Sequence, residues 1–462
     1  MVSTPIRVRV RMYQVGFGDC FLISVEYDEP LADGRAERHL LIDYGTSHSP
    51  RKGFARGRMA EVAALIEQHT HGELDVLAVT HRHRDHLRGF EVDAGAAIMR
   101  KLAPKVVLRS WTEDPALAVD ATGPGGGAAL AGAAAAGAAS ADGAAAAAAA
   151  DGAVGAASTA YAQSLARTQG HTARLAGLVG LDDDVRAAAE DQLKNAEAVA
   201  LLDELSKDGR GRYLYAGADA GLAELIPGLT TTVLGPPTVD QDERVAKQAA
   251  DDKEYWLAAL DASLALTSAT PEVELDGDAR AAMPVGPGPV RWLVEHLQSQ
   301  RTHSMLRLVR NLDDALNNTS LLLLFEFEKL KLLFPGDAQI ENWQYTLDRL
   351  DDEPALRDRL ATVDLYKVGH HGSRNATPRS LWGLWKERSD DLPKLTALMS
   401  TRRDVHGDAI DTAVPQDQLV MALHEVADVY STDEPVSSEA FVELVAEVGV
   451  GGPFRPVPPP GR

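Results

Sequence analysis

One short segment restricts the fold of this chain more than any other feature. Three histidines and an aspartate fall within residues 81–86, directly after the apolar run 74–79. Such a run is typical of a buried strand, and alternate side chains of an extended segment point the same way. His81, His83 and Asp85 would therefore share one side, with the last histidine at the following turn. Because imidazole and carboxylate groups are ligands for Zn²⁺ and similar ions, the segment predicts a metal site at the end of a buried strand.

Ligand-type residues also stand at the ends of other predicted strands. Asp43 ends the third strand-like segment, and an acid at this position either caps a turn or belongs to a site. Asp337 follows a predicted hairpin over 320–334, in the turn Pro-Gly-Asp-Ala. A further apolar segment, 364–368, ends on Gly-His-His-Gly-Ser. We therefore expect a layered fold in which loops after strands supply the ligands.

The domain organisation follows from the order of the predicted elements. Over residues 1–435 this order, β-β-β-α-β and then further strands and helices, is typical of an α/β or α+β layered sandwich. Residues 116–160 are dominated by Ala and Gly, with too little apolar surface to offset the entropy lost on folding. Residues 238–316 are charged and partly helix-like, and we interpret them as a second insertion that could act as a lid. For residues 436–462 we expect a helix followed by a Pro-rich tail.

The composition excludes several classes of protein. Asp and Glu total 68 and Lys and Arg total 46, so the net charge of -22 argues against a global basic surface for a long nucleic acid. The single cysteine, Cys20, excludes an internal disulfide and a cysteine-rich metal site, and we interpret it as a small buried residue. We find no apolar signal-peptide core and no run of about 20 strongly apolar residues. A cytoplasmic protein without a membrane span is therefore expected.

Five sequence blocks occur in an order that indicates a family. They are VGFGDC at 15–20, LIDYG at 41–45, HRHRDH at 81–86, NNTSL at 317–321 with FPGD at 334–337, and KVGHHGS at 367–373. In this order they resemble the metallo-β-lactamase fold superfamily. Within it, the chain is most similar to the soluble hydrolase domain of ComEC-type competence proteins, which are associated with DNA uptake. The resemblance covers residues 6–115, 190–237 and 315–435 and leaves both insertions unexplained.

The resemblance implies a four-layer αββα sandwich with one or two divalent metal ions at the edge of the sheets. It assigns the first metal to His81 and His83. It assigns the second metal to Asp85, His86 and His370. Asp337 would be the carboxylate that bridges the two metals. His371 is the alternative to His370, and Asp43 would orient one of the ligands.

One position departs from the family pattern. Many members supply a further histidine to the first metal from the block before the Asp337 hairpin, where this chain has Asn318 and its neighbours. An amide oxygen is a poorer zinc ligand than an imidazole, so the first site would be weaker or suited to Mn²⁺. We therefore expect zinc, with manganese as the alternative.

These residues predict a hydrolase. The metal ions would activate a water molecule, with Asp85 or Asp337 as the proton acceptor. Several side chains near the same edge would bind an anionic substrate: Arg374, Ser373, Arg402 and His406. We predict a phosphodiesterase or nuclease acting on single-stranded DNA, a nucleotide or another phosphodiester. Two alternatives stay open, namely hydrolysis of a lactone, thioester or β-lactam, and a catalytically silent binding module.

Overall fold

The computed structural model describes most of the predicted core of the chain. The described residues are 3–50, 58–114, 195–238, 240–242, 244, 316–373, 377–405, 413–433 and 440–457. All of them belong to one of the two compact units into which the chain divides. The predicted insertion at 116–160 and nearly all of the one at 238–316 lie outside the described residues.

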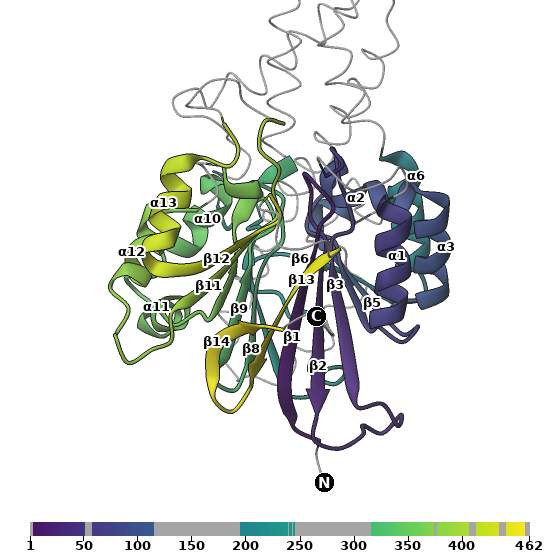
Figure 1. Ribbon diagram of the computed structural model, residues 1–462, viewed down its shortest axis with the longest axis horizontal. Helices are drawn as coiled ribbons and strands as arrows, with labels where there is room; N and C mark the ends of the chain where they lie inside the picture. Colours follow the sequence, from purple (N-terminus) through teal and green to yellow (C-terminus); the bar gives the residue numbers. More distant parts are fainter. Residues whose placement is uncertain are drawn as a thin grey trace, which may run out of the picture. The chain divides into compact units, whose positions relative to one another are not determined.

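The described residues form two β-sheets whose inner faces share one apolar core (Figure 1). The first sheet has eight strands in the order β14-β13-β1-β2-β3-β4-β5-β6. These are β14 Gly451–Pro456, β13 Phe441–Glu447, β1 Pro5–Tyr13, β2 Phe21–Tyr27, β3 Glu37–Ile42, β4 Val76–Ala78, β5 Val106–Ser110 and β6 Gly211–Leu214. The part from β14 to β3 is antiparallel, and the part from β3 to β6 is parallel.

The second sheet has six strands in the order β12-β11-β10-β9-β8-β7. They are β12 Ala427–Ser431, β11 Leu395–Met399, β10 Leu365–Lys367, β9 Leu330–Phe334, β8 Leu322–Phe327 and β7 Leu229–Gly235. From β9 to β12 the strands run parallel. The carboxyl ends of these strands and of β3, β4 and β5 are therefore the places where loops can carry a site.

Helices cover the outer face of each sheet (Figure 1). Those on the first sheet are α1 Arg58–His69, α2 Arg84–Glu91, α3 Asp93–Leu102 and α6 Ala196–Leu205. Those on the second sheet are α10 Ile340–Leu347, α11 Pro354–Ala361, α12 Arg379–Lys386 and α13 Asp417–Val426. The prediction of a mixed α/β fold is confirmed. Within the described part of the chain, no helix combines the length and apolar character needed to span a bilayer.

The side chains of β1 alternate between the core that lies between the sheets and the opposite face of the strand. Val8, Val10 and Met12 face the core between the sheets, where the rings of Phe21 and Phe334 pack edge to face at 5.7 Å. The intervening arginines lie on the other face of the strand, because successive strand side chains point to opposite sides. The predicted half-buried strand at the start of the chain is thus confirmed.

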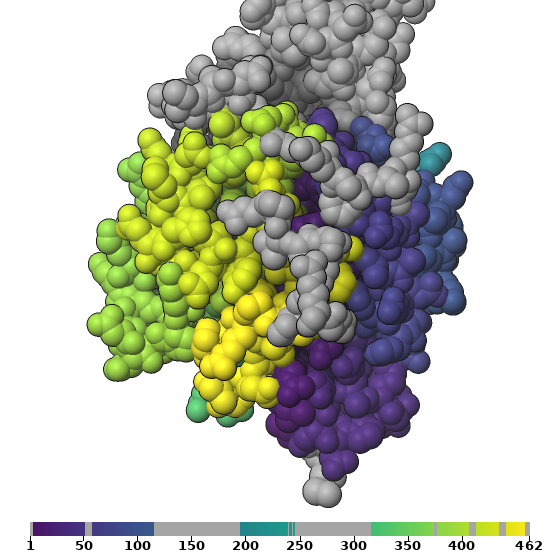
Figure 2. All heavy atoms as spheres, viewed as in Figure 1, coloured from purple at the N-terminus to yellow at the C-terminus, as the bar shows by residue number. Residues whose placement is uncertain are grey.

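The expectation of a C-terminal helix and tail was wrong for residues 441–456. They form β13 and β14, and β13 pairs with β1 so that Leu444 lies opposite Val10. Figure 2 shows these C-terminal residues in yellow against the purple N-terminal residues. The segment FVELVAE contains good helix formers, but its apolar residues recur with period two and fill the inter-sheet core. Long-range pairing therefore overrides helix propensity here.

This pairing makes the C-terminal hairpin part of the core. Substitution of the fully buried Leu444 by alanine should lower the free energy of unfolding by about 2–5 kcal/mol, because it removes apolar contacts and leaves a cavity. Val450→Ala, at a position 75% exposed in the hairpin turn, should change it by less than about 0.5 kcal/mol. Urea denaturation of both variants measures the difference. Equal stability of the two would mean that β13 does not occupy this core in solution.

Candidate metal centre

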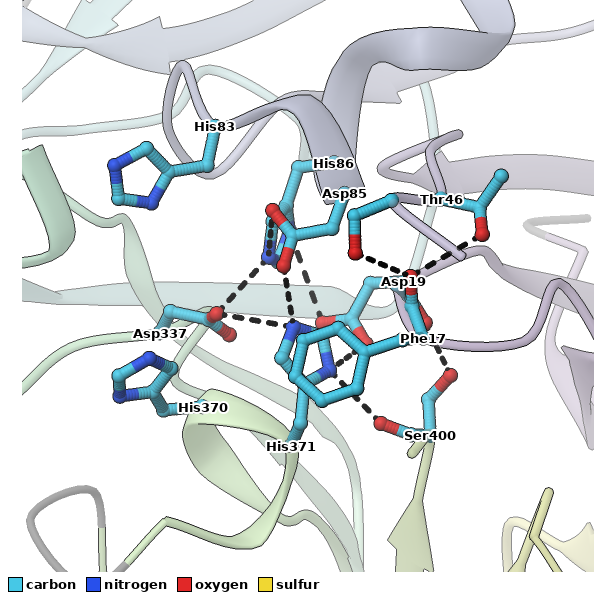
Figure 3. A network of polar contacts seen from close by, with 12 residues as sticks. Phe17, Asp19, Thr46, His83, Asp85, His86, Asp337, His370, His371 and Ser400 are labelled. Carbon is cyan, nitrogen blue, oxygen red and sulfur yellow. Dashed lines mark hydrogen bonds and ion pairs between the residues drawn. The ribbon is translucent and has the colours of Figure 1, made fainter. Parts of the chain in front are cut away.

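Two histidines and two aspartates from three distant parts of the chain form one buried group (Figure 3). We call Asp85, His86, Asp337 and His371 the four-residue group. Each offers a nitrogen or oxygen atom, and these atoms all lie within 4.8 Å of one another. Asp85 and His86 lie in the first turn of α2, Asp337 follows β9, and His371 follows β10. The predicted strand ends therefore meet at one edge.

The contacts within the group join nitrogen and carboxylate atoms. Nε2 of His371 lies 3.0 Å from Oδ2 of Asp85 and 3.3 Å from Oδ2 of Asp337. Nε2 of His86 lies 3.0 Å from the same Oδ2 of Asp337. Two imidazole nitrogens and two carboxylates converging on one point are a donor set that suits a borderline divalent ion. These buried residues could hold a metal ion.

Outer partners fix the orientation of both imidazole rings. Nδ1 of His86 donates to Oδ2 of Asp43 at 2.7 Å, and Nδ1 of His371 donates to the carbonyl of Ser400 at 2.8 Å. Asp43 in turn accepts hydrogen bonds from the main-chain nitrogen and the hydroxyl of Thr80, at 2.8 and 2.7 Å. Since each Nδ1 carries the proton, each Nε2 is left to face the group. This is the outer arrangement that metal-ligating histidines commonly have.

Close backbone packing holds the segment that carries these residues. A Cβ atom added at Gly45 would lie 2.3 Å from the main-chain carbonyl carbon of His86, so only glycine fits. The main-chain nitrogen of Tyr44 donates to the carbonyl of His86 at 3.0 Å. The loop after β3 therefore supports both the backbone and the ring of His86.

The other two predicted metal ligands form a pair beside the four-residue group, with the ring centroids of His81 and His86 4.2 Å apart. Nε2 of His81 lies 2.9 Å from Nδ1 of His83, and both side chains are buried. Among the described residues, no group of three or more acidic, histidine or cysteine side chains includes this pair. Asn318, the predicted alternative ligand, is fully buried and donates from Nδ2 to Oε2 of Glu341 at 3.1 Å. Within the described residues, its Oδ1 has no hydrogen-bond partner.

The preference for His370 over His371 needs correction. His371 belongs to the four-residue group (Figure 3), whereas Nδ1 of His370 lies 3.0 Å from the hydroxyl of Ser373. Both histidines have left-handed backbones, with φ of 40° and 53°. This turn directs the side chain of His371 to within 3.0 Å of Asp85 and 3.3 Å of Asp337. The handedness of the turn cannot be read from a Gly-His-His-Gly segment, so the sequence left both choices open.

Left-handed backbone is concentrated at this site. Asp43 also has a positive φ, of 54°, so three non-glycine residues adopt a conformation that costs each about 1–2 kcal/mol. Such residues persist where the surrounding structure holds them in place, and they gather at functional sites. The cost indicates that the positions of Asp43 and His371 matter more than local backbone stability.

Of the four predicted substrate-binding residues, two belong to the described part of the chain. Arg374 and His406 lie outside the described residues. Ser373 is buried beside His370, and Arg402 donates from Nη1 to the main-chain carbonyl of Ser49. Cys20 is buried, in agreement with its interpretation as a packing residue.

Comparisons with known proteins give no family: no protein-family model matches the chain, and no curated protein matches it significantly.

Arg82, one of the arginines within the histidine segment, turns toward another cluster. Its Nε lies 2.7 Å from Oε1 of the buried Glu113, which also accepts from Nη2 of Arg109 at 2.9 Å. A positive charge that is held by a buried carboxylate contributes less to an anion-binding surface. Arg82 therefore points away from the four-residue group, while Asp85 and His86 do not continue an extended segment because α2 begins at Arg84.

Two buried charged residues at this site were missed by sequence reasoning. Lys367, at the end of β10, has a side chain only 2% exposed, and its Nζ lies 3.0 Å from Oδ1 of Asp337. It also forms an ion pair with Asp19, in the loop between β1 and β2, whose side chain is 1% exposed. The available signal was a lysine inside an otherwise apolar strand, because lysine is almost never fully buried without a partner.

Charges in the site determine which histidines carry a proton. Burial alone would lower the pKa of His371, but the carboxylates of Asp337 and Asp19 raise it to about 10. Burial lowers the pKa of His81 well below its usual value, and the neighbouring histidines lower it further. At neutral pH His371 is thus protonated without a metal, whereas His81 is neutral. Burial would also lower the pKa of His86, but the carboxylates of Asp337 and Asp43 raise it well above its usual value. Because a ligating imidazole must be neutral, metal binding at the four-residue group would release protons from both histidines.

Proposed function

We propose that this protein is a metal-dependent hydrolase that cleaves phosphodiesters. The observation that carries the proposal is the convergence of two oriented imidazoles and two carboxylates, from separate strand ends, in one buried group. The order of the sequence blocks supports it, because it is similar to that of the metallo-β-lactamase superfamily and its ComEC-type domains. Two sheets with helices on their outer faces are compatible with the αββα sandwich of that superfamily.

We assign one metal position to the four-residue group. A second, weaker position would lie at His81 and His83, with the buried Oδ1 of Asn318 as a candidate third donor. The mixed nitrogen and oxygen donors favour Zn²⁺, with Mn²⁺ as the alternative. A divalent ion bound there would lower the pKa of a water molecule and stabilise negative charge on a phosphoryl oxygen.

Within the four-residue group, Asp85 is the side chain with the most direct route for passing a proton from that water to solvent. Its side chain is 16% exposed, whereas those of the other three are at most 2% exposed. Burial opposes its ionisation, yet the hydrogen bond with His371 and the charges of His86 and His371 lower its pKa below the usual range. Asp85 is therefore ionised at neutral pH and can pass a proton to solvent. Oδ1 of Asp337 accepts a hydrogen bond from Lys367, and the Asp337 side chain is not exposed to solvent.

The charge of the chain limits the size of the substrate. A net charge of -22 would repel a long duplex, whose binding depends on neutralising many phosphates. A nucleotide or a short single strand needs only a local centre of positive charge, such as a bound divalent ion would provide. We therefore infer that the substrate is a small or single-stranded phosphodiester.

Hydrolysis of bis(p-nitrophenyl) phosphate and of a lactone, in the presence of added zinc or manganese, tests the proposal. We expect phosphodiester cleavage that falls by at least about 10²–10⁴-fold in Asp85→Ala, because both a metal ligand and the proton acceptor are lost. The matched control is Asp351→Ala, which removes an exposed carboxylate and should leave the rate unchanged. Lactone cleavage alone would replace the proposal by an acyl hydrolase. Metal-free protein without turnover on either substrate would favour a binding module.

A further inference from the structure

The strongest unexplained feature of the site is the buried ammonium group of Lys367. A lysine has three N–H donors, and here three acceptors surround Nζ. They are the main-chain carbonyl of Gly336 at 2.9 Å, Oδ1 of Asp337 at 3.0 Å and Oδ2 of Asp19. Two hydrogen bonds and one ion pair therefore hold an ammonium group whose side chain is only 2% exposed.

This contact separates the roles of the two oxygens of Asp337. Oδ1 faces Lys367, while Oδ2 lies 3.0 Å from Nε2 of His86 and 3.3 Å from Nε2 of His371. A free carboxylate could turn both oxygens toward a bound ion. With Oδ1 held by the ammonium group, Asp337 can present only one.

We propose that Lys367, paired with Asp19, positions Asp337 as a one-oxygen ligand and thereby sets which divalent ion the four-residue group prefers. The inference rests on the proposed metal site. Zn²⁺ usually takes four ligands in a tetrahedron, whereas larger oxygen-preferring ions accept more ligands and two oxygens of one carboxylate. Restricting Asp337 to one oxygen keeps the donor count low and favours zinc over manganese.

Asp19 contributes in two ways to the contact between Lys367 and Asp337. Its carboxylate balances the charge of Lys367, so that an ammonium group can lie beside a metal position without adding net positive charge. It also ties the two sheets together at this edge, because Asp19 follows β1 of the first sheet while Lys367 and Asp337 follow strands of the second. Residues from both sheets thus decide the orientation of one ligand.

If the ion pair of Lys367 with Asp19 only stabilises the fold, a different experimental result is expected. Buried ion pairs contribute little to stability when both partners are replaced by neutral groups of similar size. The double variant Asp19→Asn/Lys367→Met should therefore fold, and it frees Oδ1 of Asp337. If the pair only stabilises the fold, the preference between zinc and manganese should not change in this variant.

The test compares zinc and manganese affinities, by competition with a chromophoric chelator, in wild type and variants. The ratio of the manganese to the zinc dissociation constant should fall by at least about 10-fold in Asp19→Asn/Lys367→Met, within the range that outer partners impose on metal affinity. Lys367→Gln should retain more of the wild-type ratio, since its amide can still donate to Asp337. The control Arg35→Met/Asp75→Asn neutralises a buried ion pair elsewhere and should leave the ratio unchanged.

Three outcomes would overturn the inference. An unchanged ratio in the Met variant would mean that Lys367 does not set the preference. Wild type that binds neither ion would reject the metal site itself, and with it the proposed function. A crystal structure of the zinc-loaded wild type supplies a measurement that does not depend on a variant's folding: Asp337 should bind through Oδ2 alone, and two Asp337 oxygens on the ion would reject the inference while the metal site stands.

Discussion

His371→Ala should remove the metal from the four-residue group, whereas His370→Ala should retain it. His371 supplies one of the two imidazole nitrogens of the group, and its ring is fixed by Ser400. Loss of a ligand should reduce metal affinity by more than the about 10–100-fold that follows loss of an outer partner. Metal content after dialysis and phosphodiester turnover should both fall to background.

The neighbouring histidine is the matched control for this substitution. His370 has the same chemistry and the same left-handed backbone, but it contacts Ser373. His370→Ala should therefore keep wild-type metal content. His370→Gly should in addition raise the free energy of unfolding by about 1 kcal/mol, because glycine adopts a positive φ without strain. Loss of metal in the His370 variants, with retention of metal in His371→Ala, would show that His370 is the ligand and His371 is not.

Asp43→Asn should weaken metal binding by about 10–100-fold without changing any ligand. The carboxylate of Asp43 accepts from Nδ1 of His86 and from two groups of Thr80. An amide of the same shape can accept at one atom only, so the ring of His86 loses either its orientation or its proton on Nδ1. Competition with a chelator measures the affinity, and urea denaturation measures the stability of the same samples.

Asp75 offers a control of matched chemistry. It is a fully buried carboxylate just before β4, and it binds Arg35, Lys105 and the main-chain nitrogen of His39. Asp75→Asn should lower the stability of the fold because Arg35 and Lys105 lose the buried carboxylate that pairs with them. Metal affinity per folded molecule should not change. If Asp43→Asn and Asp75→Asn bind metal with equal affinity, Asp43 supports the loop after β3 and does not orient the ring of His86.

The features that could be predicted from the sequence are local ones. The period-two pattern of β1 and the apolar run before His81 identify strands because burial of one face requires that spacing. The position of Asp337 after a hairpin predicted it as a candidate site residue, and the structure places it in the four-residue group. These inferences depend on neighbours in the chain, which a sequence displays directly.

The remaining features depend on contacts between distant segments or on backbone handedness. The ion pair of Asp19 with Lys367 joins the two sheets, and neither residue alone indicates its partner. The choice between His370 and His371 is made by two consecutive left-handed residues. A helix-favouring C-terminal segment becomes β13 because the edge of β1 needs a partner. The period-two spacing of residues 441–447 and the lysine within an apolar strand are the only local signals of these features, and neither names the distant partner.

The pairing of β1 with β13 also has a consequence for how the chain is made. Arg11 and Glu443, which contact each other across these strands, are 432 residues apart. During synthesis from the ribosome, one edge of β1 must stay without its partner until the segment 441–447 has emerged. An unpaired strand edge is a template for association with other chains. The first sheet can therefore close only late in synthesis, and nascent chains that end before residue 441 should be the form most prone to aggregate.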